Sequence, residues 1–255
     1  MAVIALTSAS GSPGVTTAAL GMALLWPRPV LLVEADPTGG SGLLAGYFRG
    51  TREYGGGLIE LALTSSSIRD GLAEVSQRIE GTTVSFVAGT RSHTQAPALR
   101  DLWQPRSEEL TELESTGQDV IVDAGRLGLV GSPEPLLANA DLTLVVTRTN
   151  LPSISAVRSW ADSIQRGTFD WQQSGVLVVG EGQPYGTGEV SRALNSPMVA
   201  TLPDDPEAAA VFSRGDQPPK RFEVGPLARG LHAAIAAIHS TVSRRRSELL
   251  EGARP

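Results

Sequence analysis

The feature that most constrains the fold is a series of short, mostly apolar segments that alternate with segments of helical pattern. A continuous apolar run is typical of a strand covered on both faces, and such strands occur in parallel sheets with helices on either side. Parallel neighbours also need long crossover connections, which the intervening helical segments provide. The predicted strands are residues 3–7, 30–33, 83–87, 119–123, 142–146, 175–179 and 198–201.

The segments between these strands predict the helices of a single α/β domain over residues 1–255. We expect a three-layer domain with a mostly parallel central sheet of seven to eight strands. The tail at about 247–255 is expected to be flexible, and 213–226 is predicted to be a surface loop. The predicted helices are residues 16–25, 57–63, 68–72, 96–114 (one helix or two), 133–139, 153–164, 188–194, 205–212 and 225–250.

Composition excludes several chemistries. The 255 residues include no cysteine and one lysine, Lys220. Disulfides, thiolate nucleophiles, iron–sulfur clusters and cysteine-ligated zinc are therefore excluded, as is any mechanism that needs a lysine near the N-terminus. A net charge of −6 argues against nucleic acid as a partner. No apolar run reaches the roughly 18–20 residues of a membrane span, and the N-terminus resembles a strand rather than a signal peptide, so we expect a cytoplasmic protein. Direct membrane binding is not expected either, because the apolar face after the arginines at 244–246 consists only of Leu249 and Leu250.

A glycine-rich turn follows the first predicted strand and leads into a helix, while Asp36 and Asp123 stand at or just past the ends of two other strands. Ligands of open parallel sheets bind at this edge. The N–H groups of such a turn and of the helix start favour a phosphate. A threonine in the first helical turn, here Thr16, can bind Mg²⁺ together with a strand-end aspartate such as Asp123.

The turn departs from the standard phosphate loop Gly-x-x-x-x-Gly-Lys-Ser/Thr, because Val15 occupies the lysine position and Ala9 the position of the first glycine. The wider pattern nevertheless resembles the deviant Walker A box, switch I and Walker B of the ParA/MinD ATPases. The similar segments are Ser10-Gly11-Ser12-Pro13-Gly14-Val15-Thr16-Thr17, residues 30–37 and residues 119–125, and fainter similarity continues through residues 140–158 and 201–215.

The resemblance implies ATP or ADP with Mg²⁺ as cofactors. It assigns Mg²⁺ to Thr16 and Asp123, and it assigns orientation of the attacking water to Asp36. The nucleotide positions that it implies are Gly11, Ser12, Gly14, Val15, Thr16 and Thr17.

The departures from that family are informative. Its two box lysines correspond to Val15 and Ser10, and Pro13 removes a backbone N–H from the loop. Gly180 stands where the family often places an asparagine for the purine. An arginine, either Arg126 or Arg148, is a candidate for the missing charge. We therefore expect weakened nucleotide binding and very slow or no hydrolysis, and whether the chain is an enzyme stays open.

The lysine-free box also resembles the TadZ/CpaE-like proteins of actinobacterial Tad/Flp pilus and secretion loci. This similarity predicts a localisation or assembly adaptor that could form a homodimer. A protein partner, such as a secretion ATPase or the polar or division machinery, would bring it to the membrane. The alternative is an active, atypical ATPase that partitions chromosomes or plasmids or places a division site. A metabolic enzyme of the same superfamily is a third alternative.

Simpler interpretations stay open for individual residues. Asp36 and Asp123 could be surface carboxylates, and the two threonines could only cap a helix. Glu34 is either a second site carboxylate or a strand-edge residue. His232 and His239 are predicted to be helix-surface histidines rather than metal ligands, and the arginines at 244–246 are predicted to form a solvated helix end.

Overall fold

The computed structural model describes residues 2–11, 13–64, 67–99, 103, 117–165 and 171–252. Its central feature is an eight-stranded sheet with the order β3-β4-β2-β5-β1-β6-β7-β8, in which only β3 is antiparallel to its neighbour. The strands are β1 (Val3–Ser8), β2 (Val30–Glu34), β3 (Gln77–Arg78), β4 (Val84–Val87), β5 (Asp119–Arg126), β6 (Leu142–Arg148), β7 (Ser174–Val179) and β8 (Met198–Leu202).

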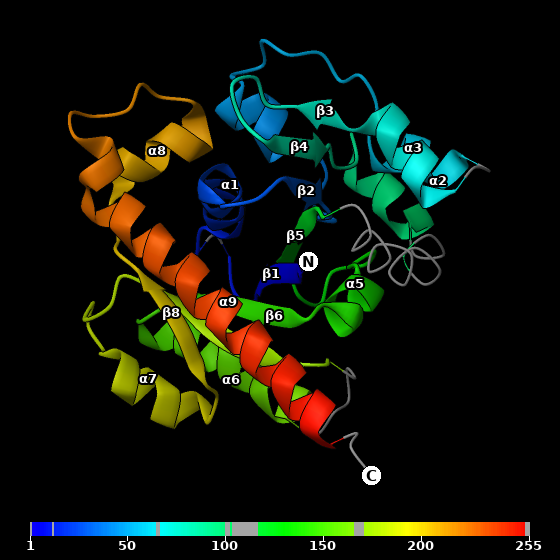
Figure 1. Ribbon diagram of the computed structural model, residues 1–255. Coiled ribbons are helices and arrows are strands. Elements are labelled where there is room, and N and C mark those ends of the chain that lie inside the picture. Colours follow the sequence, from blue (N-terminus) through cyan, green and yellow to red (C-terminus); the bar gives the residue numbers. More distant parts are fainter. Residues whose placement is uncertain are drawn as a thin grey trace.

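Helices cover both faces of the sheet, as Figure 1 shows. The α-helices are α1 (Val15–Leu25), α2 (Leu58–Leu63), α3 (Ile68–Val75), α5 (Glu134–Asn139), α6 (Leu151–Gln165), α7 (Thr187–Leu194), α8 (Pro206–Arg214) and α9 (Pro226–Gly252). A π-helical turn η1 (Leu43–Tyr47) and the 3₁₀ segments η2 (His93–Leu99) and η4 (Phe222–Val224) complete the described elements.

Alternation of side chains along the strands produces the layers. In β1, Ile4 and Leu6 belong to the core shared with α1, α8 and α9, whereas Val3 and Ala5 belong to the core on the opposite face with α2, α3 and α5. A third cluster joins β6 and β7 to α6 and α7. Both faces of the strands are thus buried, which explains their continuous apolar sequences and confirms the predicted three-layer α/β architecture.

Several local features differ from the sequence-based expectation. The two-residue strand β3 and the π-helical turn η1 were not predicted, and 213–226 contains η4. Most of the predicted helical segment 96–114 lies outside the described residues, and its first part belongs to η2. Within the described residues, no helix combines the length and the apolarity needed to cross a membrane.

Candidate functional site

The carboxyl ends of three adjacent strands, β2, β5 and β1, bring the predicted site residues together. The turn after β1, Asp36 after β2 and the end of β5 surround a pocket of about 540 Å³, which we call the loop pocket. Among the described residues, its lining consists of Ser8, Gly11, Pro13, Gly14, Val15, Thr16, Thr17, Asp36, Thr38, Gly125, Arg126 and Leu129. Ser12, also predicted for this site, lies outside the described residues.

The start of α1 leaves room for a ligand in this pocket. Gly14 precedes the helix with φ of 102°, a left-handed conformation that favours glycine, and no side chain caps the helix. A Cβ added to Gly11 or Gly14 would meet no atom within 4 Å. The first N–H groups of a helix lack intrahelical partners, so this open, uncapped turn could receive an anion such as a phosphate.

Val15 supplies no charge to the pocket. Its side chain is 7% exposed and belongs to the apolar core beneath α1. Pro13 beside it is also buried and has no N–H to donate. An anion in the loop pocket would therefore rely on backbone N–H groups, hydroxyls and whatever cation neighbouring elements supply.

Thr16 connects the loop to a buried carboxylate. Its hydroxyl donates to the carboxylate of Asp123, which also accepts from the backbone N–H of Gly125 at 3.1 Å. Asp123 is 2% exposed, and burial, reinforced by the charge of Asp36, raises its pKa to about 6. A hydroxyl and a buried carboxylate side by side are oxygen ligands suited to Mg²⁺, which usually keeps several waters and contacts substrate phosphates as well.

Asp36 is held at the rim of the pocket. Its Oδ1 accepts from the backbone N–H and the hydroxyl of Thr38, each at 2.8 Å. Gly125, with φ of 61°, packs so closely that an added Cβ would stand 2.2 Å from Asp36 Cγ. The carboxylates of Asp36 and Asp123 thus lie near one another, as their positions after neighbouring strands predict.

Glu34, predicted to be either a second site carboxylate or a strand-edge residue, is a buried carboxylate at the end of β2. It is 4% exposed and accepts from the Ser41 hydroxyl and from the N–H groups of Leu43 (3.0 Å) and Gly89 (3.3 Å). Burial is the main reason why its pKa is raised to about 7. Glu34 therefore ties the segment before η1 to the ends of β2 and β4, a role that only the three-dimensional pairing reveals.

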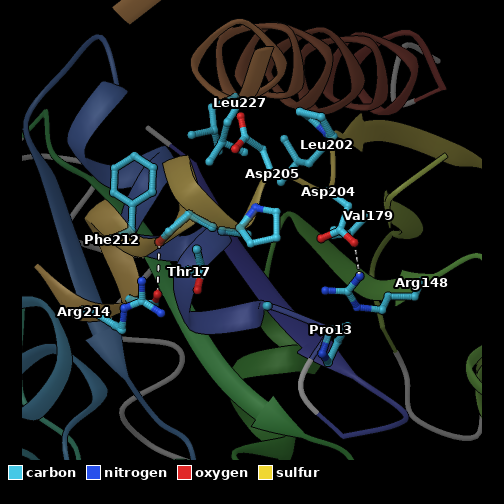
Figure 2. A pocket seen from close by; sticks show the side chains of 17 residues that line it. Pro13, Thr17, Arg148, Val179, Leu202, Asp204, Asp205, Phe212, Arg214 and Leu227 are labelled. Carbon is cyan, nitrogen blue, oxygen red and sulfur yellow. Dashed lines mark hydrogen bonds and ion pairs between the residues drawn. The ribbon is translucent and has the colours of Figure 1, made fainter. Parts of the chain in front are cut away.

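A second, smaller pocket of about 310 Å³ adjoins the first, since Pro13, Gly14 and Thr17 line both. Residues of α8 and α9 line it, and Figure 2 shows the side chains of Phe212, Leu202 and Leu227 around it. Arg148 also lines this pocket, and its guanidinium pairs with the carboxylate of Asp204 at 2.8 Å. Apolar and charged side chains line this pocket together, since Asp204, Asp205 and Arg214 also belong to its wall.

Comparisons with known proteins rest on structure. No protein-family model matches the chain, and no curated protein matches its sequence significantly. Among solved structures, MinD cell division protein of Aquifex aeolicus has a TM-score of 0.72 at 16% identity over 94% of this chain and 97% of its own. Its complex with MinC also gives 0.72, at 15% identity over 94% and 96%.

Two further solved structures have a similar likeness to this chain. The septum site-determining protein MinD of Pyrococcus horikoshii OT3, complexed with Mg-ADP, has a TM-score of 0.71 at 14% identity over 93% of this chain and 95% of its own. A ParA family ATPase of Chlorobium tepidum TLS gives 0.69 at 14% identity over 93% and 98%. The chain has the MinD/ParA fold. At this level of identity the likeness defines the architecture, while the chemistry depends on the residues present.

Within the MinD/ParA fold, the structure separates the two arginines considered as replacements for the missing lysines. Arg126, at the end of β5, lines the loop pocket. Arg148, at the end of β6, lines the second pocket and is engaged by Asp204. Lys220 lines neither of the two pockets.

The remaining candidates occupy structural positions. His239 packs against Trp26 with ring centroids 4.8 Å apart, and burial lowers its pKa, whereas His232 is exposed. At the end of α9, Arg246 pairs with Asp141 at 2.9 Å and Arg244 approaches Glu248 at 4.0 Å. No group of three or more potential metal-binding side chains occurs in the part of the chain that the structure describes.

Proposed function

We propose that this chain is a MinD/ParA-like localisation or assembly adaptor that binds nucleotide weakly and hydrolyses it very slowly or not at all. The observation that carries the proposal is the burial of Val15 in the apolar core at the lysine position of an otherwise open loop pocket. The fold favours a nucleotide there, and the Mg-ADP complex of the Pyrococcus protein supports the choice of cofactor.

Each part of a magnesium nucleotide has candidate partners. The phosphates would contact the N–H groups at the start of α1 and the Thr17 hydroxyl, and the ring would enter the second pocket. Mg²⁺ would be held by Thr16 and Asp123, with Asp36 facing the attacking water. When bound, the metal neutralises phosphate charge.

The missing lysine accounts for weak binding and slow turnover. A hydrogen bond to a charged group contributes about 1.5–3 kcal/mol, which corresponds to about 10–100-fold in affinity. Hydrolysis should suffer more, because negative charge develops on the phosphoryl oxygens in the transition state and an apolar side chain cannot stabilise it.

Calorimetric titration with Mg-ATP and Mg-ADP tests this proposal. We expect weak binding by the natural chain and a gain of about 10–100-fold in Val15→Lys. Val15→Met is the matched control, since it adds length without charge and should give no gain. Low-micromolar ATP binding by the natural chain, with magnesium-dependent turnover that Asp36→Ala abolishes, would refute the adaptor proposal.

The proposed partner is a protein, and a pilus or secretion ATPase of the Tad/Flp type is the specific candidate. The complex of a MinD protein with MinC supports a protein partner for this fold. We place the chain in the cytoplasm, recruited to the membrane through that partner. If the chain forms a homodimer, its mass in analytical ultracentrifugation should not depend on Mg-ATP, because the nucleotide site is weak.

The alternative function is an active partitioning or division-site ATPase. It needs a substitute cation at the loop, for which Arg126 in the loop pocket is available, and in addition rapid hydrolysis, which phosphate binding by Arg126 alone does not imply. This alternative predicts ATP-dependent dimerisation and salt-sensitive binding to non-specific DNA. A gel-shift assay at low salt that detects no DNA complex with Mg-ATP would exclude the DNA branch.

A further inference from the structure

We infer that Arg126 is the residue that binds phosphate in the loop pocket, so that the positive charge comes from the end of β5 rather than from the loop itself. This inference rests on the proposed nucleotide site. The ligand class is a magnesium-bound diphosphate or triphosphate ester, and the inference adds the residue that recognises its charge.

The backbone around Arg126 is fixed beside the loop. Arg126 is in register with Ser8 of β1, and the next residue, Leu127, donates its N–H to the Ser8 carbonyl at 2.8 Å. The preceding carbonyl, that of Gly125, accepts from the Thr7 hydroxyl at 3.2 Å. Since β1 leads directly into the loop, these bonds anchor Arg126 at the pocket wall.

The guanidinium of Arg126 is available for a ligand. Its side chain is exposed, and no hydrogen bond or ion pair joins it to another residue of the described ranges. Arg148, which ends β6, is occupied because it pairs with Asp204. Arg28 precedes β2 at the opposite edge of the sheet and pairs with Asp119. Arg126 is thus the arginine that lines the loop pocket without a partner among the described residues.

The surroundings match the chemistry of a guanidinium–phosphate pair. Arginine offers several N–H donors in one plane and binds phosphate through two parallel hydrogen bonds. Asp36 lines the same pocket and Asp123 lies below it, so a bound phosphate would need both a cation and Mg²⁺ to offset these carboxylates. Arg126 supplies the first, while Thr16 and Asp123 are placed to hold the second.

The test is calorimetric titration of the full chain with Mg-ADP and, separately, with magnesium pyrophosphate. Arg126→Ala should weaken both by tenfold or more, and Arg126→Lys should recover part of the loss. Arg244→Ala removes an equal charge far along α9 and should bind as the natural chain does. Unfolding midpoints of all variants should match, and Arg126→Gln serves as a second, polar replacement.

Relocation of the charge makes the test specific. In the double variant Val15→Lys/Arg126→Ala, a lysine at the loop position should restore the affinity that Arg126→Ala loses. Natural-chain affinity in both Arg126→Ala and Arg126→Gln, or no binding of either ligand by the natural chain, would overturn the inference. Rapid Mg-ATP turnover that still requires Arg126 would instead refute the adaptor function and leave this inference standing.

Discussion

Two buried aspartates of β5 have very different surroundings within one strand. Asp119, at the start of the strand, is 0% exposed, and Asp123, in its middle, is 2% exposed. Asp119 accepts from the Ala2 N–H at 2.6 Å and the Trp26 indole N–H at 2.7 Å, and it pairs with Arg28 at 2.7 Å. Asp123 receives the Thr16 hydroxyl and one backbone N–H.

The difference lies in the counter-charge. A buried carboxylate is stable when a cation and several donors replace its hydration, and it is costly otherwise. Asp119 has both, so it holds the N-terminal strand, α1 and β5 together. Asp123 has donors but carries a raised pKa and the nearby charge of Asp36. The first arrangement is complete within the fold, whereas the second suits a site that an external cation completes.

The largest predicted effect concerns pH. The folded pKa values of Glu34 (about 7) and Asp123 (about 6) exceed their ordinary values of 4.5 and 3.8. Between these limits the folded state binds more protons than the unfolded state, so stability falls as pH rises from about 4 to about 7. At roughly 1.4 kcal/mol per pKa unit, the titration of each group should lower the free energy of unfolding by on the order of 3 kcal/mol over this pH range.

Urea unfolding between pH 4 and pH 8 measures this dependence. Glu34→Gln and Asp123→Asn should each flatten the curve, since the amides do not titrate. Equal slopes in the natural chain and both variants would show that the carboxyl end of the sheet is not electrostatically unfavourable, and the contrast with Asp119 would disappear.

The second prediction compares the same substitution at the two buried aspartates of β5. Asp119→Asn should lower the free energy of unfolding by about 2–3 kcal/mol. The substitution removes the negative partner of Arg28, and the new side-chain NH₂ group would face the N–H donors that the carboxylate now accepts from. Asp123→Asn should cost less than about 1 kcal/mol or stabilise, since it removes a desolvated charge and keeps an acceptor for Gly125. Urea unfolding at pH 8 decides, and equal losses would contradict the comparison.

Sequence patterns predicted those parts of the molecule that depend on local signals. Continuous apolar runs located most of the sheet, and the glycine-rich turn with Thr16, Asp36 and Asp123 identified the residues that the strand order brings together. The two-residue β3 and the π-helical turn η1 carry no periodic signal and were missed. The contacts of Glu34 depend on Ser41 and Gly89, so they follow from packing rather than from any motif.

The choice between Arg126 and Arg148 also required the three-dimensional strand order. Both arginines end a strand, and the sequence alone does not show which of them reaches the loop. Because β5 and β6 lie on opposite sides of β1, Arg126 reaches the loop pocket while Arg148 faces Asp204. A parallel sheet thus converts equivalent sequence positions into different chemical environments.

The smallest predicted effect separates two adjacent threonines in α1. Thr16→Val removes the hydroxyl that donates to buried Asp123, so it should cost about 1–2 kcal/mol at pH 8 and raise the Asp123 pKa further. Thr17→Val is the matched control: Thr17 is half-buried between the two pockets and should change stability by less than about 0.5 kcal/mol. Urea unfolding of both variants at pH 8 and pH 5 tests this, and the Thr16→Val deficit should shrink at pH 5 because protonated Asp123 needs the donor less. A deficit that is equal at both pH values, or equal in the two variants, would mean that Thr16 acts through packing alone and that Asp123 does not depend on its donors.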